Sequence, residues 1–337
     1  MTPILVRPFD NSKADYEAFA TVYDSVHPDK ETTGAKLREE DTRHDPRFLK
    51  KRLLATENGR VVGICVYFHL AWVYHPRRFL FELMVSPDAR RHGVGTALYE
   101  QMRADLAPRR PLALHTNHRE DWPGSADFAA RFGFVEQYRA FESRLSVADF
   151  DAAPWDAASR KPAEFGVGLH TLEEMQNTVP DWERKLWELE CEAFVDIPTP
   201  VPLTPAPLET YKTEVLQSPH LLPQGFFIAV HEETREWVGS SALWKRDDGD
   251  LNTGFTGVRQ AWRRKGIALA LKLRAIEYAR LVNCPKIRTD NASANRPMLS
   301  INEALGFVKE PAWIELVQEL EPGGATARWN ETEEPTP

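Results

Sequence analysis

Cysteine is scarce in this sequence, and the few residues present are scattered. The 337 residues include three cysteines, Cys65, Cys191 and Cys284, and none of them belongs to a CxxC pair. This spacing argues against a disulfide framework and against a cysteine-based zinc site. We therefore expect a reducing compartment and no bound metal.

Long apolar runs are absent as well. The longest one, from Val61 to Tyr74, is interrupted by His69 and is too short to span a bilayer. The first residues, MTPILVRPFD, contain no apolar signal core. The sequence therefore predicts no membrane partner and a cytoplasmic location.

An excess of basic residues is also lacking. The formal net charge is −8, whereas a general nucleic-acid binder needs a basic face, so we expect no nucleic-acid partner. The GxGxxG pattern of dinucleotide-binding folds does not occur, which disfavours that class. The composition, with 42% apolar and 27% charged residues, is that of an ordinary globular protein.

What the sequence does contain is one pattern that occurs twice. A set of residues in the first half has identical counterparts 173 positions further on, with no gap between the first pair and the last. The set is Val85, Arg90, Arg91, Gly93, Leu98, Thr116, Gly133 and Phe134, matched by Val258, Arg263, Arg264, Gly266, Leu271, Thr289, Gly306 and Phe307. A repeat of this length has the size of a domain rather than of a solenoid unit.

We therefore expect two copies of one α/β domain. The boundaries that composition suggests are an N-terminal domain at 1–146, a linker at 147–165, a C-terminal domain at 166–321 and a disordered polar tail at 322–337. In the second copy, a helix is expected over 266–282, with Lys272 on its solvated side. A proline-rich segment at 197–207 is expected to be an extended loop, either a stiff spacer or a lid.

The repeated segment has phosphate-binding chemistry. After a strand that ends in valine come basic residues, then a glycine, a hydrophobic residue and a small residue that opens a helix. Cations before a helix N-terminus are opposed by the helix dipole unless an anion lies there, and the exposed N–H groups would bind the same anion. The predicted anion-binding residues are Arg90, Arg91, His92, Gly93, Val94 and Gly95 in the first copy, and Arg263, Arg264, Lys265, Gly266, Ile267 and Ala268 in the second.

Both segments, RxxGxG at 90–95 and RxxGxA at 263–268, resemble the acetyl-CoA pyrophosphate loop of the GCN5-related N-acetyltransferase (GNAT) superfamily. The Gly-Phe pairs at 133–134 and 306–307 also lie where that family has one. The resemblance covers nearly the whole chain as a tandem. It implies that each copy is a mixed β-sheet, splayed open after its fourth strand and flanked by helices, with acetyl-CoA in the wedge.

The resemblance assigns further cofactor contacts. Asn291 and Asn295 look like the asparagines with which this family hydrogen-bonds the pantetheine arm. The backbone N–H near Val258, or near Val85 in the first copy, would polarise the thioester carbonyl. The amine of the acceptor would then attack directly, without a covalent enzyme intermediate.

Neither copy keeps every feature of the family. Where the family often has a tyrosine that protonates the leaving thiolate, the second copy has Asn302, a poor acid, and the first has Ala129. The asparagine positions of the first copy hold His118 and Trp122. The second copy therefore has the fuller set of cofactor residues, although it lacks the usual acid.

The general base is less clear from the sequence. In the first copy Glu82 lies among apolar residues of a strand, where it could act as a base or simply face solvent. The second copy has Thr253 and Thr256 in that strand. Its acidic candidates are Glu190, Glu192 and Asp196 beside the proline-rich segment, and Glu315 on the last strand, and the sequence does not decide among them.

The sequence thus predicts an acetyl-CoA-dependent N-acetyltransferase that acetylates an amine of a small molecule or peptide, with the C-terminal copy as the active half. Two alternatives stay open. One is a catalytically silent acyl-CoA-binding scaffold or sensor, and the other is catalysis by the N-terminal copy through Glu82. Two linked copies can pack as a pseudo-dimer, so a monomer or a homodimer is expected.

Overall fold

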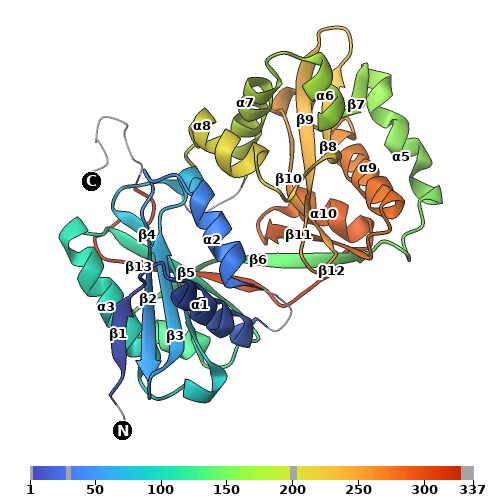
Figure 1. The fold of residues 1–337 in the computed structure, drawn as a ribbon. Helices are drawn as coiled ribbons and strands as arrows, with labels where there is room; N and C mark the ends of the chain where they lie inside the picture. The colour runs from blue at the N-terminus through green and yellow to red at the C-terminus, as the bar shows by residue number, and fades with distance from the viewer. Residues whose placement is uncertain (1–2, 28–31, 198–202, 328–337) are drawn as a thin grey trace.

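Thirteen strands form one continuous β-sheet in the computed structural model, which describes residues 3–27, 32–197 and 203–327 (Figure 1). The strand order is β1-β2-β3-β4-β5-β13-β6-β11-β10-β9-β8-β7, and the short strand β12 pairs with β6 off this path. Helices lie on both faces of the sheet (Figure 1). The mixed α/β architecture that the sequence predicts is therefore confirmed.

The two halves of the chain contribute similar successions of elements, with α8, η6 and β12 added in the C-terminal half. In the N-terminal half these are β1 (Leu5–Pro8), α1 (Lys13–Val26), α2 (Gly34–Arg43), β2 (Lys50–Glu57), β3 (Arg60–Phe68), β4 (Arg78–Val85), α3 (Val94–Leu106), β5 (Ala113–Arg119), α4 (Ser125–Arg131) and β6 (Val135–Ser146). In the C-terminal half they are β7 (Val167–Thr171), α6 (Leu172–Thr178), α7 (Trp182–Phe194), α8 (Leu208–Tyr211), the π-helix η6 (Lys212–Leu216), β8 (Leu221–His231), β9 (Glu236–Lys245), β10 (Leu251–Val258), α9 (Ile267–Leu281), β11 (Lys286–Ala292), α10 (Arg296–Ala304), β12 (Val308–Lys309) and β13 (Trp313–Glu319).

Local sequence signals account for several of these boundaries. The side chains of Ser12 and Thr33 cap α1 and α2 by accepting hydrogen bonds from N–H groups in the first turn. Asn58 and Gly59 both have positive φ, at 53° and 77°, and connect β2 to β3 as a tight hairpin. Elements rich in such signals were predictable from the sequence alone.

The two halves exchange their last strands. Strand β6, which ends the N-terminal half, pairs from Ala140 to Ser146 with the whole of β11 in the C-terminal half. Strand β13, which ends the C-terminal half, pairs with β5 of the N-terminal half. The two exchanged strands then pair with each other and make the sheet continuous, so that β6 runs from one half into the other in Figure 1.

Separate apolar layers cover the two faces of each half. In the N-terminal half, α3 packs Leu98 and Met102 on the face of Phe79 and Phe81, while α1 and α2 cover the opposite face. In the C-terminal half, α9 covers one face of the sheet, and α6 and α7 cover the other. Each half is thus a sheet covered by helices on both faces.

The segments between and after the halves are packed rather than extended. The predicted linker contains α5 (Asp156–Arg160) and the 3₁₀ turn η5 (Lys161–Phe165), and its Trp155 and Phe165 join the apolar cluster beneath α9. In the predicted tail, residues 322–327 form turns in which Ala325 is buried and accepts a hydrogen bond from Arg78. Residues 328–337, and residues 198–202 of the proline-rich segment, lie outside the described residues.

Lys272 does not face solvent, so that prediction was wrong. It is 3% exposed, because α9 is covered by the sheet on one side and by further elements on the other. Its ammonium lies 5.5 Å from the centre of the Phe307 ring. A helical pattern read on its own cannot show that a helix is covered on more than one side.

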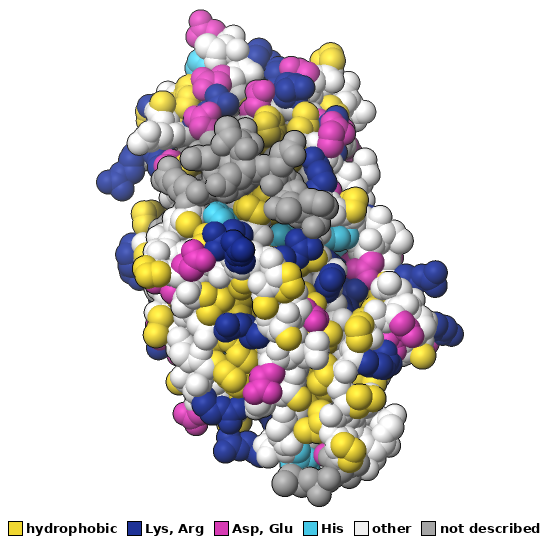
Figure 2. All heavy atoms as spheres, turned by 90° about the vertical axis from the view of Figure 1, so that its left-hand side faces the viewer, with side chains coloured by type: hydrophobic (Ala, Val, Ile, Leu, Met, Phe, Trp, Pro, Cys, Tyr) yellow, Lys and Arg dark blue, Asp and Glu magenta, His cyan; other side chains and the backbone are white. Residues whose placement is uncertain are grey.

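Within the described part of the chain, no helix is long and apolar enough to cross a membrane. On the face shown in Figure 2, basic and acidic side chains are interspersed among hydrophobic ones.

Candidate active site

The two predicted phosphate loops have the same backbone conformation. Arg91 and Arg264 both have a φ of 67°, and the glycines that precede the helices, Gly93 and Gly266, have φ values of 91° and 78°. Positive φ is the reason why these helix-starting positions hold glycine. The two segments therefore form the same type of loop, since this succession of dihedral angles is rare.

The first arginine of each loop is fixed by the strand that precedes it. Nε of Arg90 donates to the carbonyl of Val85 at 3.2 Å, and Nε of Arg263 donates to the carbonyl of Val258 at 3.0 Å. These bonds hold the loop against the strand end. The first helical hydrogen bonds run from Ala97 to Gly93 and from Ala270 to Gly266, so the N–H groups before them remain for an anion.

In the C-terminal half, the packed linker adds a further cation to the loop. A Cβ atom placed on Gly266 would lie 3.1 Å from Cδ of Lys161, so the lysine stem covers this glycine. The ammonium of Lys265 lies 4.5 Å from the ring centre of Phe165, which belongs to the same 3₁₀ turn, η5, as Lys161. No motif in the sequence points to Lys161, because its position depends on how the linker packs.

Below each loop the sheet opens. Strand β4 pairs with β5 only from Arg78 to Leu80, and β10 pairs with β11 only from Leu251 to Thr253. Beyond these points the facing edges of β4 and β10 have no strand partner in the described part of the chain. Unpaired N–H and C=O groups at such an edge are donors and acceptors for an extended ligand.

The C-terminal wedge differs from the N-terminal one by a β-bulge. Thr253 pairs with Leu243 and Thr256 with Ser241, so Gly254 and Phe255 together lie opposite Ala242. The pairing of β4 with β3 continues one to one through the equivalent stretch. A bulge leaves backbone N–H and C=O groups outside the hydrogen-bond ladder and changes the direction in which they point. This bulge lies on β10, the strand that ends at Val258.

The asparagines predicted to hold the pantetheine arm have structural partners. Nδ2 of Asn302 donates to Oδ1 of Asn291 at 2.6 Å, and Asn302 is 1% exposed. The side chain of Asn295 caps α10 by accepting from the N–H of Met298. Asn302 therefore orients Asn291, and any ligand contact of Asn295 would use its amide nitrogen.

Glu190 stands out among the acidic candidates of the C-terminal half. It is buried on α7, where the Tyr211 hydroxyl donates to it at 2.7 Å and the Ser240 hydroxyl at 3.4 Å. Burial raises the pKa of Glu190 to about 7, although both hydroxyls work in the opposite direction. Because Ser240 pairs with Gly257, this carboxyl group lies beside the end of β10 that borders the wedge.

The two neighbouring acids are engaged by arginines instead. Glu192 forms an ion pair with Arg259 at 3.2 Å, and Asp196 pairs with Arg263 of the phosphate loop. A carboxylate engaged by a guanidinium is less available to a substrate amine, because it must first give up that contact. Glu190 therefore suits proton uptake best among these residues.

The assignment of Glu315 to the C-terminal half was wrong. Because β13 is exchanged, Glu315 pairs with Asn117 of β5 in the N-terminal sheet, and Nδ2 of Asn117 donates to it at 3.3 Å. Glu82 lies on the face of β4 that α1 and α2 cover, where it lines a cavity of about 370 Å³. The sequence repeat alone pairs each last strand with its own half and could not have placed Glu315.

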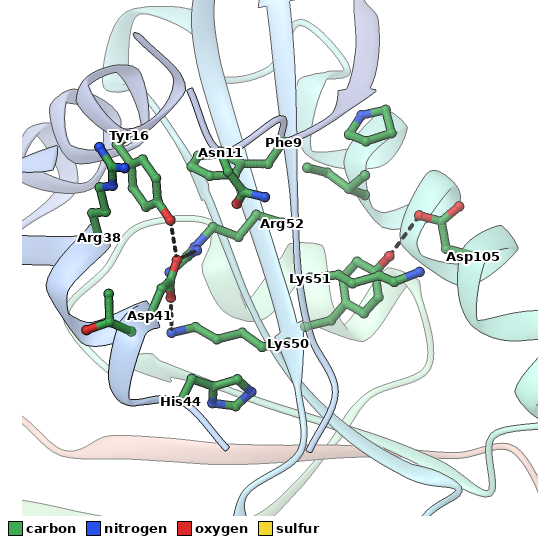
Figure 3. A pocket seen from close by; sticks show the side chains of 14 residues that line it. Phe9, Asn11, Tyr16, Arg38, Asp41, His44, Lys50, Lys51, Arg52 and Asp105 are labelled. Carbon is green, nitrogen blue, oxygen red and sulfur yellow. Dashed lines mark hydrogen bonds and ion pairs between the residues drawn. The ribbon is translucent and has the colours of Figure 1, made fainter. Parts of the chain in front are cut away.

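A larger cavity, of about 730 Å³, lies away from both wedges (Figure 3). Asp41 lies between Tyr16, Lys50 and Arg52, which donate to it at distances of 2.5 to 2.9 Å. Burial opposes the ionisation of Asp41, but these hydrogen bonds outweigh it and hold its pKa well below the usual range. The cluster ties α1 and α2 to β2.

The described residues contain no group of His, Cys, Asp and Glu that could hold a metal ion.

The family described as "Acetyltransferase (GNAT) family" matches residues 16–134 and 184–307 of this sequence. The chain belongs to this family. It carries two GNAT units in tandem and is an N-acetyltransferase, as the sequence predicts.

Two mycothiol acetyltransferases align with this GNAT protein over more than two thirds of both chains. Mycothiol acetyltransferase of Thermobifida fusca is 28% identical over 259 residues, which cover 74% of this chain and 77% of the relative. Mycothiol acetyltransferase of Geodermatophilus obscurus is 30% identical over 239 residues, covering 68% and 70%. The solved tandem GNAT protein from the clavulanic acid biosynthesis pathway has a TM-score of 0.72 at 18% identity and covers 94% of this chain and 98% of its own.

Proposed function

We propose that this GNAT protein transfers the acetyl group of acetyl-CoA to an amine of a small-molecule acceptor, and that the C-terminal half carries out the reaction. The observation that carries the second part is the β-bulge at Gly254 and Phe255, because only the C-terminal wedge combines it with the loop at 263–268 and with Asn291. Acetyl-CoA would supply the activated acyl group at that wedge.

Each part of the site has a defined task in this proposal. The N–H groups at the start of α9, with Arg264 and Lys265, bind the pyrophosphate. Backbone N–H groups on the open edge of β10, between the bulge at Gly254 and Phe255 and the end of the strand at Val258, stabilise the negative charge that develops on the thioester oxygen. Asn291, oriented by Asn302, binds the pantetheine arm.

We assign uptake of the amine proton to Glu190. A base works best when its pKa lies near the working pH, and burial places this carboxyl group there. Asn302, at the position of the family's acid, does not protonate the leaving thiolate, because an amide does not release a proton. The thiolate of CoA is a tolerable leaving group, so this absence slows the reaction rather than preventing it.

The relatives suggest the class of acceptor. Several curated relatives that cover two thirds or more of this chain are mycothiol acetyltransferases, so we propose a mycothiol-related amine as the acceptor. A cytoplasmic location and a monomeric or dimeric state stay predictions from the sequence.

The test uses two matched loop variants, Gly266→Glu and Gly93→Glu. Both place a side chain at a position of positive φ and put a negative charge where the pyrophosphate would bind, so their backbone strain is comparable; at Gly266 the new Cβ also displaces the flexible stem of Lys161 slightly. Release of free CoA with a mycothiol-related amine should be lost in Gly266→Glu and kept in Gly93→Glu. The reverse pattern would overturn the assignment of the active half. If calorimetry shows that acetyl-CoA binds to the unaltered protein but no amine leads to release of CoA, the silent acyl-CoA-binding scaffold replaces the enzyme.

A further inference from the structure

The cavity of about 730 Å³ drawn in Figure 3 lies at the edge of the N-terminal sheet. Strand β1 pairs with β2 only as far as Leu53, so the first residues of β2 lie beyond the end of β1. Strand β3 separates β2 from β4, the strand that borders the N-terminal wedge. The cavity is therefore distinct from the wedge, and its volume is in the range of small-ligand sites.

Alternation along β2 divides the cavity into two sides. Leu54 packs in the apolar cluster beneath α1 and α2, whereas Leu53 packs in the cluster beneath α3. Successive side chains of a strand point to opposite faces of the sheet. Lys50 and Arg52 therefore lie on the side of α1 and α2, and Lys51 lies on the side of α3.

On the side of α1 and α2, the acidic residue among those that line the cavity is Asp41, and its acceptor positions are all used. Its Oδ1 accepts from Lys50 at 2.8 Å and from Arg52 at 2.9 Å. Its Oδ2 accepts from Tyr16 at 2.7 Å and from Arg52 at 2.5 Å. Since each carboxylate oxygen has about two acceptor sites, Asp41 has none left for a further donor.

Arg38 of α2 lines the same side of the cavity and lacks such a partner. Within the described part of the chain its guanidinium forms no ion pair or hydrogen bond, and no dashed line reaches it in Figure 3. A guanidinium keeps its charge and offers five N–H donors, and Lys50 has donors left beyond the one that Asp41 uses. With Arg38, Lys50 and Arg52 set against Asp41, this side of the cavity carries two uncompensated positive charges.

The side of α3 is balanced instead. Lys51 and Asp105 both line it, so one positive charge faces one negative charge. The hydroxyl of Tyr67 donates to Asp105 at 2.9 Å. The excess of positive charge is therefore confined to the side of α1 and α2.

An apolar wall adjoins the unpaired donors. Pro8, Phe9 and Tyr16 line it, and the rings of Phe9 and Tyr16 meet edge to face with their centres 4.9 Å apart. The ring centre of Phe9 also lies 5.3 Å from the guanidinium carbon of Arg52. The wall and the basic cluster are thus held together, and a ligand with an anionic group on a compact apolar body can use both.

We infer that this cavity binds a phosphate monoester, with its phosphate group between Arg38 of α2 and Lys50 of β2 and its body against Phe9. A phosphate monoester carries a charge of about −1.5 to −2 at neutral pH, which matches the two uncompensated positive charges. Its terminal oxygens accept charge-assisted hydrogen bonds from guanidinium and ammonium groups. The site is additional to both phosphate loops and does not depend on the proposed transfer reaction.

Phenyl phosphate is a suitable probe, because it joins a dianionic phosphate to one aromatic ring. Its affinity is measured by calorimetry on the full chain at pH 7, in a buffer without phosphate and without acetyl-CoA. Arg38→Gln should weaken binding about tenfold or more, because the phosphate loses a charge-assisted donor. The side chain of Arg38 is exposed and makes no hydrogen bond or ion pair, so this variant should fold normally.

The cavity itself offers a matched control. Lys51→Gln removes the same charge from an exposed position of the same cavity, but on the side of α3. It should weaken binding by about threefold or less, as expected of a screened surface charge. Equal weakening in Arg38→Gln and Lys51→Gln would mean a diffuse attraction to basic side chains and would overturn the inference.

Two analogues test the ligand. Phenol, which lacks the phosphate, should bind at least about tenfold more weakly than phenyl phosphate. Benzoate, a monoanion with the same ring, should also bind more weakly, because it leaves one positive charge without a partner. No binding of phenyl phosphate, or equal binding of either analogue, would contradict the proposed site.

The phosphate loops are separated from the cavity by their own variants. The titration is repeated in Gly93→Glu and in Gly266→Glu, with circular dichroism to confirm that each is folded. Binding that depends on Arg38 should persist in both, and its loss in either folded variant would assign the probe to that loop and overturn the inference. Because the titrations contain no acetyl-CoA, these outcomes are independent of the test of the C-terminal half.

Discussion

Replacing Lys272 with methionine should stabilise the protein at neutral pH. The lysine is 3% exposed on α9, and the contact that the structure gives its ammonium is the ring of Phe307. Burial lowers its pKa from the usual 10.5 to about 8. Methionine fills nearly the same volume without a charge, and its flexible side chain adapts to the site.

The sign and size of the effect follow from proton linkage. The unfolded chain binds a proton at this lysine more tightly than the folded chain does, so the charge costs stability below pH 8 and the cost disappears as the pH rises through 10.5. A difference of about 2.5 pKa units corresponds to about 3 kcal/mol at pH 7, and the same linkage leaves about 1 kcal/mol at pH 10. Lys272→Met should recover most of that free energy.

Urea unfolding at pH 7 and pH 10 measures this difference. The control is Lys286→Met, which removes an exposed lysine from β11 and should change the free energy of unfolding by about 0.5 kcal/mol or less. The reasoning is refuted if Lys272→Met destabilises the protein at pH 7, or if its effect is the same at both pH values. Either result would mean that Lys272 has a favourable partner in the folded state.

Other residues give further predictions. Asp41→Asn should lower the free energy of unfolding by about 3 kcal/mol, because Arg52, with 7% of its side chain exposed, loses its partner. Since the pKa of Asp41 is held below its usual range, urea unfolding should show this difference above pH 4 and a shrinking one as the pH falls further. In assays of CoA release, Glu190→Gln should reduce kcat and remove the fall in kcat/KM below about pH 7, whereas Glu192→Gln should do neither. Tyr211→Phe should move that fall to higher pH, because the hydroxyl of Tyr211 lowers the pKa of Glu190. An unchanged pH profile in both Glu190→Gln and Tyr211→Phe would exclude Glu190 as the base.

Much of the fold could be predicted because local signals and the repeat agreed. The strands from β2 to β4 and the helix after each phosphate loop lie where alternation, the Asn58-Gly59 turn and the glycines place them. Both loops also have the conformation that their cations and glycines suggest. These features depend on residues that are close in sequence, and such features are encoded locally.

The rest depends on contacts between segments far apart in the chain. Lys161 reaches the loop at Gly266 only because the linker folds onto α9, and Lys272 is buried because elements from several parts of the chain cover the same helix. Glu190 has its raised pKa because α7 and β9 meet around it. No periodicity or motif in the sequence states which segments will meet.

The strand exchange changes how the repeat itself should be used. Aligning the two copies places Glu142 and Glu315 at one position, and a reader of the sequence would assign each to the half that contains it. Because β6 and β13 cross over, each residue instead borders the wedge of the other half: Glu142 lies beside Arg288 of the C-terminal sheet and Glu315 beside Asn117 of the N-terminal sheet. A role inferred for a residue of the last strand of one half therefore belongs to the site of the other half. Roles inferred for the phosphate loops belong to the half that contains the loop. The two sites lie on either side of the paired strands β13 and β6, so a change in either strand is expected to act on the opposite half first.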